Sequence, residues 1–443
     1  MFAQHTLLVS LVLITRCHSQ HVGYKLSKSS EPPIRLGILD SFVQGVHDIA
    51  TVLSSVPDTI SILLNQDEEQ INLYAPSDNE DAYLNITQLT AKYGYPCEEH
   101  SVETEDGYII NMHRIPHGRK NRMNNSTVFL MHGFMDSSDS WILQGPDKAL
   151  AYILADEGFD VWLGNARGNK HALRHNTLNR NQSDFWDFTW EDMGIYDLPV
   201  MIDHALNVTD KESLYYIGYS QGTTSFFVMT SLKPEYNDKI KMMFALAPVA
   251  WMANVRSPLV KMFSPAFNFL SNVLWDYNFI NTEFLESFSG TICGILGTNC
   301  HSVMYMIVGH DSKYMNDVMP VMLGHMPTTS STLQLVHYGQ LVKSGRFCRF
   351  DFGAQRNMEI YGAEYPPDYD LSNVAVPVVL YFSENDWLAD IADVQILEHH
   401  LQNIYESNYI QDFNHLDFLY ASKANEIIYS KIVTQILDFA EVD

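Results

Sequence analysis

Gly218-Tyr219-Ser220-Gln221-Gly222 fits the pattern G-x-S-x-G. An apolar run, Leu214–Ile217, precedes this pentad, and a run suited to a helix, Thr223–Leu232, follows it. A strand, a tight turn and a helix form the context in which such a pentad becomes a nucleophile elbow. The glycines allow a sharp bend and keep bulky side chains away from a strained serine, and the helix N-terminus favours the negative charge of acyl transfer. Ser220 is therefore the candidate nucleophile.

Length and charge restrict the remaining possibilities. The chain has 443 residues, enough for one large α/β domain with an insertion or for several smaller domains. Its formal net charge of −26 argues against a nucleic-acid partner and against binding to anionic membranes through basic patches. An acidic, soluble surface is the simpler interpretation, and a lumen of low pH would neutralise part of it. No Cys/His spacing resembles a zinc site, so neither a metal nor another cofactor is expected.

The N-terminus has the features of a secretory signal. The apolar stretch Leu7–Ile14 is too short to span a bilayer, and the small residue Ser19 stands at the expected cleavage point, although no basic residue precedes Arg16. Residues 1–19 are therefore predicted to be a signal peptide, with no transmembrane segment, and the protein is expected in the secretory pathway, either extracellular or lysosomal. Five N-glycosylation sequons agree with this route, at Asn85, Asn124, Asn125, Asn181 and Asn207.

Residues 20–80 differ from the rest of the chain because they are acidic, loop-rich and without strand-like runs. Between Ile38 and Leu53, apolar residues recur at helical spacing and predict one amphipathic helix. Its polar face carries no Lys or Arg, which is a poor match to a membrane-surface helix. We interpret this region as a pro-segment or an N-terminal extension that docks on the main domain.

From Tyr93 on, strand-like and helical segments alternate. The apolar runs suit strands that are buried on both faces of a mostly parallel sheet flanked by helices. These runs are Val128–Met131, Phe159–Leu163, Leu214–Ile217, Met242–Leu246 and Val376–Phe382. A further strand, Asn408–Phe413, is predicted before a C-terminal helix, Ala424–Phe439. The core is thus expected in two parts, residues 81–250 and 371–443.

Residues 251–370 interrupt this alternation and are crowded with Phe, Met, Trp and Tyr. We predict a helical cap or lid inserted into the core, in which most of these side chains form a second apolar core and some line an acyl pocket. Cys293 and Cys300 lie seven residues apart, close enough to staple a short loop in an oxidising compartment. Cys97 and Cys348 are either buried free thiols or a long-range pair.

The general base is expected after the acid along the chain, because hydrolases with this elbow carry the nucleophile, the acid and the histidine in that order. His415 lies just past the predicted strand Asn408–Phe413, where such a base belongs. His399 and His400 fall instead within a helical stretch. His415 is therefore the candidate base.

The acid should also follow a strand. Glu384 and Asp386 both come after Val376–Phe382, and Asp386 is preferred. A serine hydroxyl is a weak nucleophile until an imidazole accepts its proton, and a buried carboxylate then fixes the imidazole tautomer and stabilises the imidazolium. The three side chains together can therefore carry out acyl transfer.

An oxyanion hole requires backbone N–H groups beside the nucleophile. One donor is expected from Gln221, directly after the serine, and the other from the loop after Val128–Met131, at Phe134. His132 in the same loop is interpreted as a residue that shapes the loop and not as a catalytic residue.

Taken together, these residues resemble those of the animal acid lipases, the group that contains gastric and lysosomal acid lipases and many secreted insect lipases. The resemblance covers the chain from about residue 82 to its end. It is carried by Gly94-Tyr95-Pro96, Thr104–Tyr108, Leu130–Gly133, Asp160–Asn169, Phe185–Phe188, Asp197–Pro199, Ser220–Thr224, Asp386–Asp390 and Asn414–Phe418.

This resemblance implies an α/β-hydrolase fold with a cap and lid that acts on fatty acyl esters of neutral lipids at an oil–water or membrane interface. It also implies a nucleophile at Ser220, an acid at Asp386, a base at His415, oxyanion amides at Phe134 and Gln221, and a cap disulfide between Cys293 and Cys300. The sequence departs from the family pattern at Tyr219, where the family usually has His, at Phe134, where it has Leu, and at Ser383, where it commonly has Gly.

The sequence thus predicts a lipase that cleaves triacylglycerol or sterol esters by a Ser-Asp-His acyl-enzyme mechanism. Two alternatives remain open. One is a non-catalytic lipid-binding or storage protein on the same fold, although such proteins usually lose a triad residue and none is lost here. The other is an esterase for short-chain esters, against which the aromatic-rich residues 251–370 argue.

Overall fold

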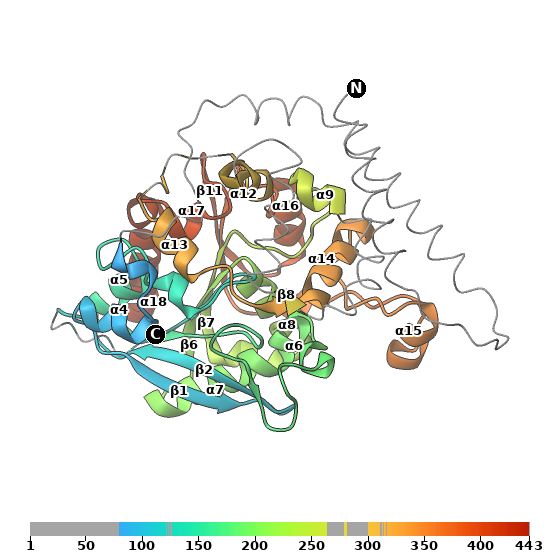
Figure 1. The fold of residues 1–443 in the computed structure, drawn as a ribbon, viewed down its shortest axis with the longest axis horizontal. Coiled ribbons are helices and arrows are strands. Elements are labelled where there is room, and N and C mark those ends of the chain that lie inside the picture. The colour runs from blue at the N-terminus through green and yellow to red at the C-terminus, as the bar shows by residue number, and fades with distance from the viewer. Residues whose placement is uncertain are drawn as a thin grey trace, which may run out of the picture.

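The computed structural model describes residues 79–263, 279–280 and 300–442, except positions 121, 123, 125, 311, 313 and 316. The predicted signal peptide, the predicted helix between residues 38 and 53, Asn125 and Cys293 lie outside the described residues. The described part from residue 79 on forms a central sheet covered by helices (Figure 1).

In the described part of the chain, nine strands form one sheet with the order β1-β2-β4-β3-β6-β7-β10-β11, and β5 pairs with β2. From β4 to β11 all neighbours are parallel, whereas β2 runs antiparallel to β1, β4 and β5. The strands of this sheet are β1 (Glu98–Glu103), β2 (Tyr108–Ile115), β3 (Thr127–Met131), β4 (Asp160–Leu163), β5 (Arg174–His175), β6 (Leu214–Tyr219), β7 (Ile240–Leu246), β10 (Val378–Ser383) and β11 (Ile404–Ile410). A small second sheet pairs β8 (Phe279–Ile280) with β9 (Ser330–Ser331).

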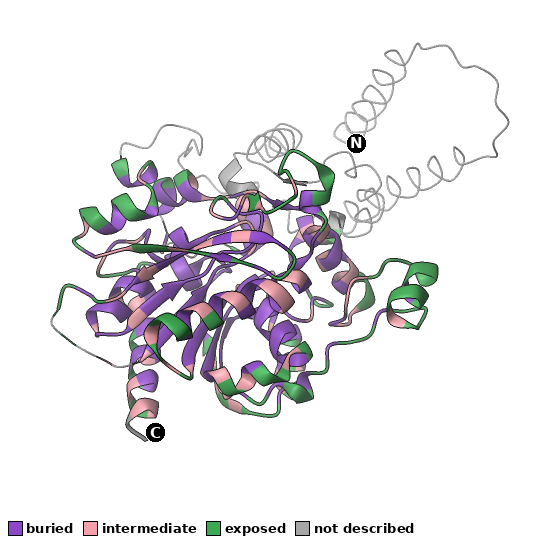
Figure 2. Ribbon diagram, turned by 90° about the horizontal axis from the view of Figure 1, so that it is seen from below, coloured by how far each residue is buried: buried purple, intermediate pink, exposed green. Residues whose placement is uncertain are grey.

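The burial of each strand follows its apolar pattern. Every residue of β3, β6 and β10 is buried, as expected for strands that are covered on both faces (Figure 2). The edge strand β11 instead alternates between more and less exposed residues, which is the pattern of a strand with one face in water. The continuous apolar runs of the sequence therefore mark the centre of the sheet.

Helices cover this sheet, most of them on a strand that they directly follow or precede. Contacts join α5 (Leu150–Asp156) to β4, α7 (Leu198–Thr209) to β1 and β3, α8 (Gln221–Leu232) to β6, and α16 (Ile391–His400) to β10. The other described helices are α4 (Ile86–Lys92), α6 (Trp190–Asp192), α9 (Pro258–Phe263), α12 (Cys300–Val308), α13 (Met319–His325), α14 (Thr332–Ser344), α15 (Ala354–Tyr361), α17 (Asp417–Tyr420) and α18 (Ser430–Val442). Short 3₁₀ and π turns are η1 (Glu80–Ala82), η2 (Ser138–Trp141), η3 (Ser183–Trp186), η4 (Met193–Asp197), η5 (Pro234–Lys239), η7 (Leu371–Asn373) and η8 (Asn425–Tyr429).

The stretch predicted as a cap, residues 251–370, contributes α9 and α12 to α15 between β7 and β10. Helix α14 is tied to the core, because the Ser331 hydroxyl at its N-cap donates to the Trp186 carbonyl at 2.7 Å and the His337 ring stacks on Trp190 with centroids 3.7 Å apart. Helix α15 projects from the body, and seven of its eight residues are at least partly exposed, with only Asn357 buried (Figure 1).

Three sequence predictions need correction. The last strand is Ile404–Ile410 and not Asn408–Phe413, because polar residues occupy the centre of this edge strand and leave it without a continuous apolar run. Strands β1 and β2 were not predicted, since β1 is almost wholly polar and polar residues interrupt the apolar run of β2. Cys97 and Cys348 are free, so the long-range pair does not form; Cys348 is buried, whereas Cys97 is only half-buried.

None of the helices in the described ranges is long and apolar enough to cross a bilayer.

Candidate active site

Ser220 lies in the turn between β6 and α8 with the backbone angles φ 51° and ψ −115°. This left-handed conformation is costly for a residue with a side chain and persists only where the surroundings hold it. The Ser220 amide donates to the Leu246 carbonyl at 3.0 Å, and the Ser220 carbonyl accepts from the Thr223 hydroxyl at 2.6 Å. The sequence prediction of an elbow between a strand and a helix agrees with this geometry.

The two glycines of the pentad supply room for this turn. A Cβ atom on Gly222 would lie 2.3 Å from the Met131 carbonyl oxygen, and one on Gly218 would lie 2.9 Å from the Gly222 backbone. Neither glycine has a positive φ; the sharp bend is at Ser220 itself. The pattern G-x-S-x-G therefore records close packing of the elbow against β3, and not backbone freedom at the glycines.

The structure brings the three predicted triad residues into one hydrogen-bonded chain. His415 Nδ1 lies 2.8 Å from Asp386 Oδ2, and His415 Nε2 lies 2.8 Å from Ser220 Oγ. The carboxylate can only accept, so in the neutral imidazole Nδ1 carries the proton and Nε2 accepts from the serine hydroxyl. All three residues are buried, with 8 % or less of their surface exposed.

Asp386, and not the alternative Glu384, is the carboxylate in contact with the histidine. Its second oxygen, Oδ1, accepts hydrogen bonds from the Leu388 and Ala389 amides, both at 2.9 Å. Glu384 is exposed. The Asp386 side chain is thus held from both of its oxygens, which orients it toward His415.

The two predicted oxyanion residues flank the nucleophile. Gln221 begins α8 directly after Ser220, and a Cβ on Gly133, next to Phe134, would lie 3.3 Å from the Ser220 Cβ. Within the described part of the chain, neither the Phe134 nor the Gln221 amide donates to another group. Two free N–H groups beside a nucleophile are what an oxyanion hole requires.

His132 occupies the structural position that the sequence suggested. Its Nδ1 donates to the Gly133 carbonyl at 2.7 Å, while Nε2 accepts from the Ala166 amide and the Asn169 carboxamide, both at 3.1 Å. Burial lowers the pKa of His132 to about 4, so the ring stays neutral in this network. The network fixes the loop that carries Phe134.

Two contacts at the site were not predicted. The Tyr219 hydroxyl donates to the His415 carbonyl at 2.9 Å, and the rings of these residues lie 5.3 Å apart. The Gln221 carboxamide donates to Gln334 of α14 at 2.7 Å, which ties the elbow to the stretch predicted as a cap. The departure from the family pattern singled out Tyr219 but not its partner, and no local signal marked Gln334.

The predicted sequon asparagines lie away from the triad. Asn85 caps α4, Asn207 lies within α7, and both are exposed, as is Asn181. Asn124 is half-buried and accepts a hydrogen bond from the Ser126 amide at 3.0 Å. Their glycosylation stays a prediction.

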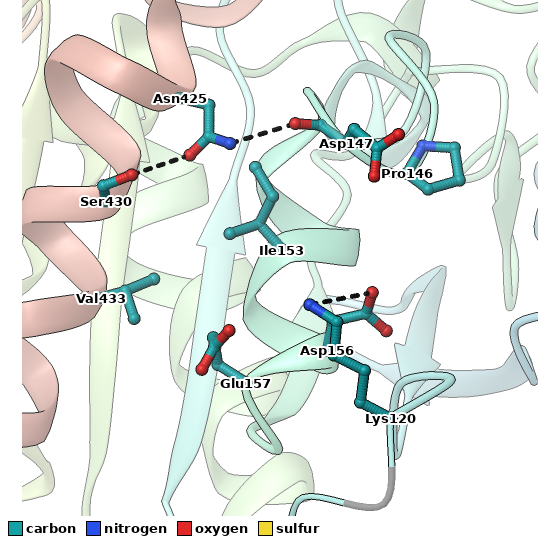
Figure 3. A pocket seen from close by; sticks show the side chains of 9 residues that line it. All are labelled: Lys120, Pro146, Asp147, Ile153, Asp156, Glu157, Asn425, Ser430 and Val433. Atoms are coloured by element: carbon teal, nitrogen blue, oxygen red, sulfur yellow. Dashed lines mark hydrogen bonds and ion pairs between the residues drawn. The ribbon is translucent and has the colours of Figure 1, made fainter.

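A separate hollow of about 340 Å³ lies between α5 and the C-terminal helices (Figure 3). It is lined by Lys120, Pro146, Asp147, Ile153, Asp156, Glu157, Asn425, Ser430 and Val433. No triad residue lines it, and its lining carboxylates engage neighbours such as Arg119 and Arg122. In the described ranges, no group of three or more His, Cys, Asp or Glu side chains is arranged to hold a metal ion.

Comparisons with known proteins place this geometry in a family. Residues 86–145 match the partial α/β-hydrolase lipase region, and residues 126–288 match the α/β hydrolase fold. The chain is 40% identical to Lipase 1 of Drosophila melanogaster over 80% of each protein. It is 38% identical to gastric triacylglycerol lipase of Rattus norvegicus, over 81% of this chain and 93% of that protein. The chain belongs to the acid lipase family.

The lipase is also 37% identical to lysosomal acid lipase/cholesteryl ester hydrolase of Homo sapiens, over 79% of this chain and 90% of that protein. Among solved structures, a soluble variant of monoglyceride lipase from Saccharomyces cerevisiae aligns with a TM-score of 0.50, over 78% of this chain and 98% of that one. At 14% identity this likeness shows the fold alone. The predictions of an α/β-hydrolase fold and of a carboxylic ester hydrolase are confirmed.

Proposed function

We propose that the lipase cleaves fatty acyl esters of neutral lipids through an acyl-enzyme formed on Ser220. The unbroken hydrogen-bonded chain from Ser220 through His415 to Asp386 carries this proposal. His415 takes the proton of the serine hydroxyl as Oγ attacks the ester carbonyl, and it then gives that proton to the leaving alcohol. A water molecule, activated by the same imidazole, releases the fatty acid in the second half of the reaction.

The tetrahedral oxyanion of each half-reaction would be bound by the Phe134 and Gln221 amides. Both amides are free in the described residues, and Gln221 adds the positive end of the α8 dipole. Because a backbone amide donates whatever its side chain, Phe at position 134 alters the shape of the pocket and not the number of donors. Asp386 keeps the proton of His415 on Nδ1 throughout.

The substrate class that we propose is a triacylglycerol or a sterol ester at an oil–water or membrane interface. Two relatives support it by their names, gastric triacylglycerol lipase and lysosomal acid lipase/cholesteryl ester hydrolase. The same names and the predicted signal peptide support a place in the secretory pathway, extracellular or lysosomal. We further propose that residues 251–370 act as the cap over the site.

Ser220→Ala tests the mechanism. We expect this variant to lose hydrolysis of emulsified triolein and cholesteryl oleate and to lose labelling by a fluorophosphonate probe, while its midpoint of thermal unfolding stays that of the wild type. Retention of near wild-type turnover by a folded Ser220→Ala protein rejects the assignment. A folded wild-type protein that the probe does not label would instead be a lipid carrier.

A chain-length series of 4-nitrophenyl esters separates the lipase from a short-chain esterase. We expect kcat/KM to rise from acetate to decanoate because a longer acyl chain buries more apolar surface, about 0.8 kcal/mol for each fully buried methylene. A preference for acetate over decanoate contradicts the proposal that the protein acts on long-chain esters as a lipase.

A further inference from the structure

The loops that carry Asp386 and His415 share a feature that the triad does not use. An asparagine precedes each of the two residues, Asn385 in the first loop and Asn414 in the second. Both carboxamides donate to one acceptor, the carbonyl oxygen of His310, at 2.9 Å from Asn385 Nδ2 and 3.1 Å from Asn414 Nδ2. One backbone carbonyl therefore holds both loops.

A second carbonyl, two residues earlier, does the same. The oxygen of Val308, the last residue of α12, accepts from the His415 amide at 3.0 Å and from the Trp387 amide at 3.4 Å. The His310 amide returns a bond to Asn385 Oδ1 at 3.0 Å. We call the loop that carries Asp386 the acid loop and the loop that carries His415 the base loop. Residues 308–310 thus bond to both loops through two carbonyl oxygens, those of Val308 and His310.

Gly309 lies between the two carbonyls and is wedged against the acid loop. Its φ is +118°, a conformation that residues with a side chain rarely adopt, and a Cβ atom there would lie 1.9 Å from the Asn385 carbonyl oxygen. This close approach allows residues 308–310 to reach both loops.

The two asparagines are also fixed within their own surroundings. Asn414 is fully buried, and its Oδ1 accepts from the Leu416 and Asp417 amides at 3.0 and 3.2 Å. Asn385 Nδ2 donates a second bond to the Asp412 carbonyl at 3.1 Å, directly across to the loop that leads to His415. Each asparagine therefore links its own loop to the other through groups of fixed position.

We propose that Asn385 and Asn414 are positioning residues that, with the backbone of residues 308–310, set the distance between Asp386 and His415. This inference rests on the proposed triad. The acid and base loops follow different strands, β10 and β11, and a single hydrogen bond of 2.8 Å joins the two catalytic side chains. A displacement of about 1 Å at such a site can lower the rate by about 10²-fold, so a clamp outside the reacting atoms controls kcat.

Asn385→Ala and Asn414→Ala test the clamp, with Asn403→Ala as the matched control. Asn403 also donates its carboxamide to a backbone carbonyl, that of Ala375 at 3.0 Å, but at the other end of β10 and β11. We expect each test variant to lower kcat on 4-nitrophenyl butyrate about tenfold at unchanged KM, and Asn403→Ala to leave both constants unchanged. Rates are divided by the fraction of sites that a fluorophosphonate titrates.

The double variant distinguishes a shared clamp from two separate supports. Because both carboxamides act on the same pair of side chains, the combined loss in Asn385→Ala/Asn414→Ala should be smaller than the product of the two single losses. Asn385→Ala/Asn403→Ala should instead show the product. Multiplicative losses in the first pair overturn the proposal.

Gly309→Ala and Gly353→Ala give a second comparison. Gly353 also has a positive φ, +86°, but a Cβ there meets nothing within 4 Å. We expect only Gly309→Ala to lower kcat per titrated site. Should Asn385→Ala and Asn414→Ala match Asn403→Ala in kcat, or lose activity only through fewer titrated sites, the positioning role is wrong.

Ser220→Ala, measured in parallel, separates the two proposals. Hydrolysis by Ser220→Ala rejects the triad and the positioning role with it. Its loss, together with asparagine variants that behave as the wild type, rejects the positioning role alone.

Discussion

Two clusters of ionisable side chains in the interior of this lipase have different roles. One is the chain Ser220–His415–Asp386. The other is centred on Arg167, which is 1 % exposed and lies between Asp106 and Asp197. Both join side chains from distant parts of the sequence, and the difference lies in how completely their hydrogen-bonding groups are engaged.

Every nitrogen of the Arg167 guanidinium contacts a carboxylate. Its Nε donates to Asp197 Oδ1 at 2.8 Å, its Nη1 and Nη2 donate to the two oxygens of Asp106 at 2.5 and 2.9 Å, and its own amide donates to Asp197 Oδ2 at 3.0 Å. The Tyr108 ring lies 4.2 Å from the guanidinium. With these contacts the Arg167 guanidinium is fixed in place and keeps its protons.

The triad, in contrast, can be hydrogen-bonded in more than one protonation state. The Ser220 hydroxyl donates to His415 Nε2 only while the ring is neutral, and proton transfer converts that bond into an imidazolium beside Asp386. Fixed ion pairs therefore make the Arg167 group structural, whereas a bond that can exchange its proton is what the proposed triad needs in order to react.

Among the variants that test this comparison, Asp386→Asn should show the largest effect, a loss of kcat. An asparagine N–H facing His415 favours the wrong imidazole tautomer, so we expect kcat to fall about 10⁴-fold with an unchanged midpoint of thermal unfolding. Steady-state kinetics and calorimetry on the same preparation measure the two quantities. A variant that unfolds at lower temperature by many degrees would show that the triad also supports the fold.

Arg167→Met should instead lower the stability of the fold. It leaves the fully buried Asp197 carboxylate without its cation, and we expect a loss of about 3–5 kcal/mol in the free energy of unfolding, measured with urea. Arg122→Met is the control, since Arg122 pairs with Glu157 on the surface and its loss should cost below about 1 kcal/mol. Equal stabilities for the two variants contradict the structural role of Arg167.

Asp136 adds a third case to the comparison, a buried carboxyl group that no cation in the described part of the chain contacts. Among the described residues its Oδ2 has no hydrogen-bond partner, and burial raises its pKa to about 7. The folded state therefore holds the proton more tightly than the unfolded state. Its contribution to stability is complete below about pH 4 and is lost as the pH rises to 7.

Asp136→Asn removes this titration. We expect the wild type to lose on the order of 3 kcal/mol in the free energy of unfolding between pH 4 and pH 7 relative to the variant. Urea unfolding at several pH values gives both curves. Parallel curves would mean that Asp136 is ionised in the folded protein.

Tyr219→Phe should have the smallest effect. It removes the hydroxyl that donates to the His415 carbonyl and keeps the ring, so we expect kcat to fall about three- to fivefold, equivalent to about 1 kcal/mol. Tyr361→Phe is the control, because the Tyr361 hydroxyl also donates to a backbone carbonyl, that of Phe350, next to α15. Equal kcat values for both variants would assign Tyr219 to packing alone.

Much of the site could be predicted because its residues follow strands. Ser220, Asp386 and His415 come after β6, β10 and β11, and the carboxyl ends of parallel strands meet at one edge of a sheet. The sequence order of nucleophile, acid and base then selected them. The edge strands were harder to place, since β11 has a polar centre and β1 is almost wholly polar, so neither shows the apolar periodicity of a strand.

The motifs that carry the family resemblance turned out to have two different uses. Asp106, Arg167 and Asp197 come from three separate motifs and meet in one ion cluster, in which Arg167 and Asp197 are buried. Nothing in the sequence distinguishes this cluster from a catalytic one, because the pairing of distant charges depends on where the loops cross.

The sequence by itself determined the central strands, the elbow and the identity of the three triad residues, because each of these depends on local apolar runs, on strand ends and on chain order. Only the tertiary structure decided that Gly222 must lack a side chain, that Gln334 contacts Gln221, and that residues 308–310 join the acid and base loops. These contacts join residues far apart in the chain, and their partners are set by how the backbone packs in space and by no pattern along the sequence.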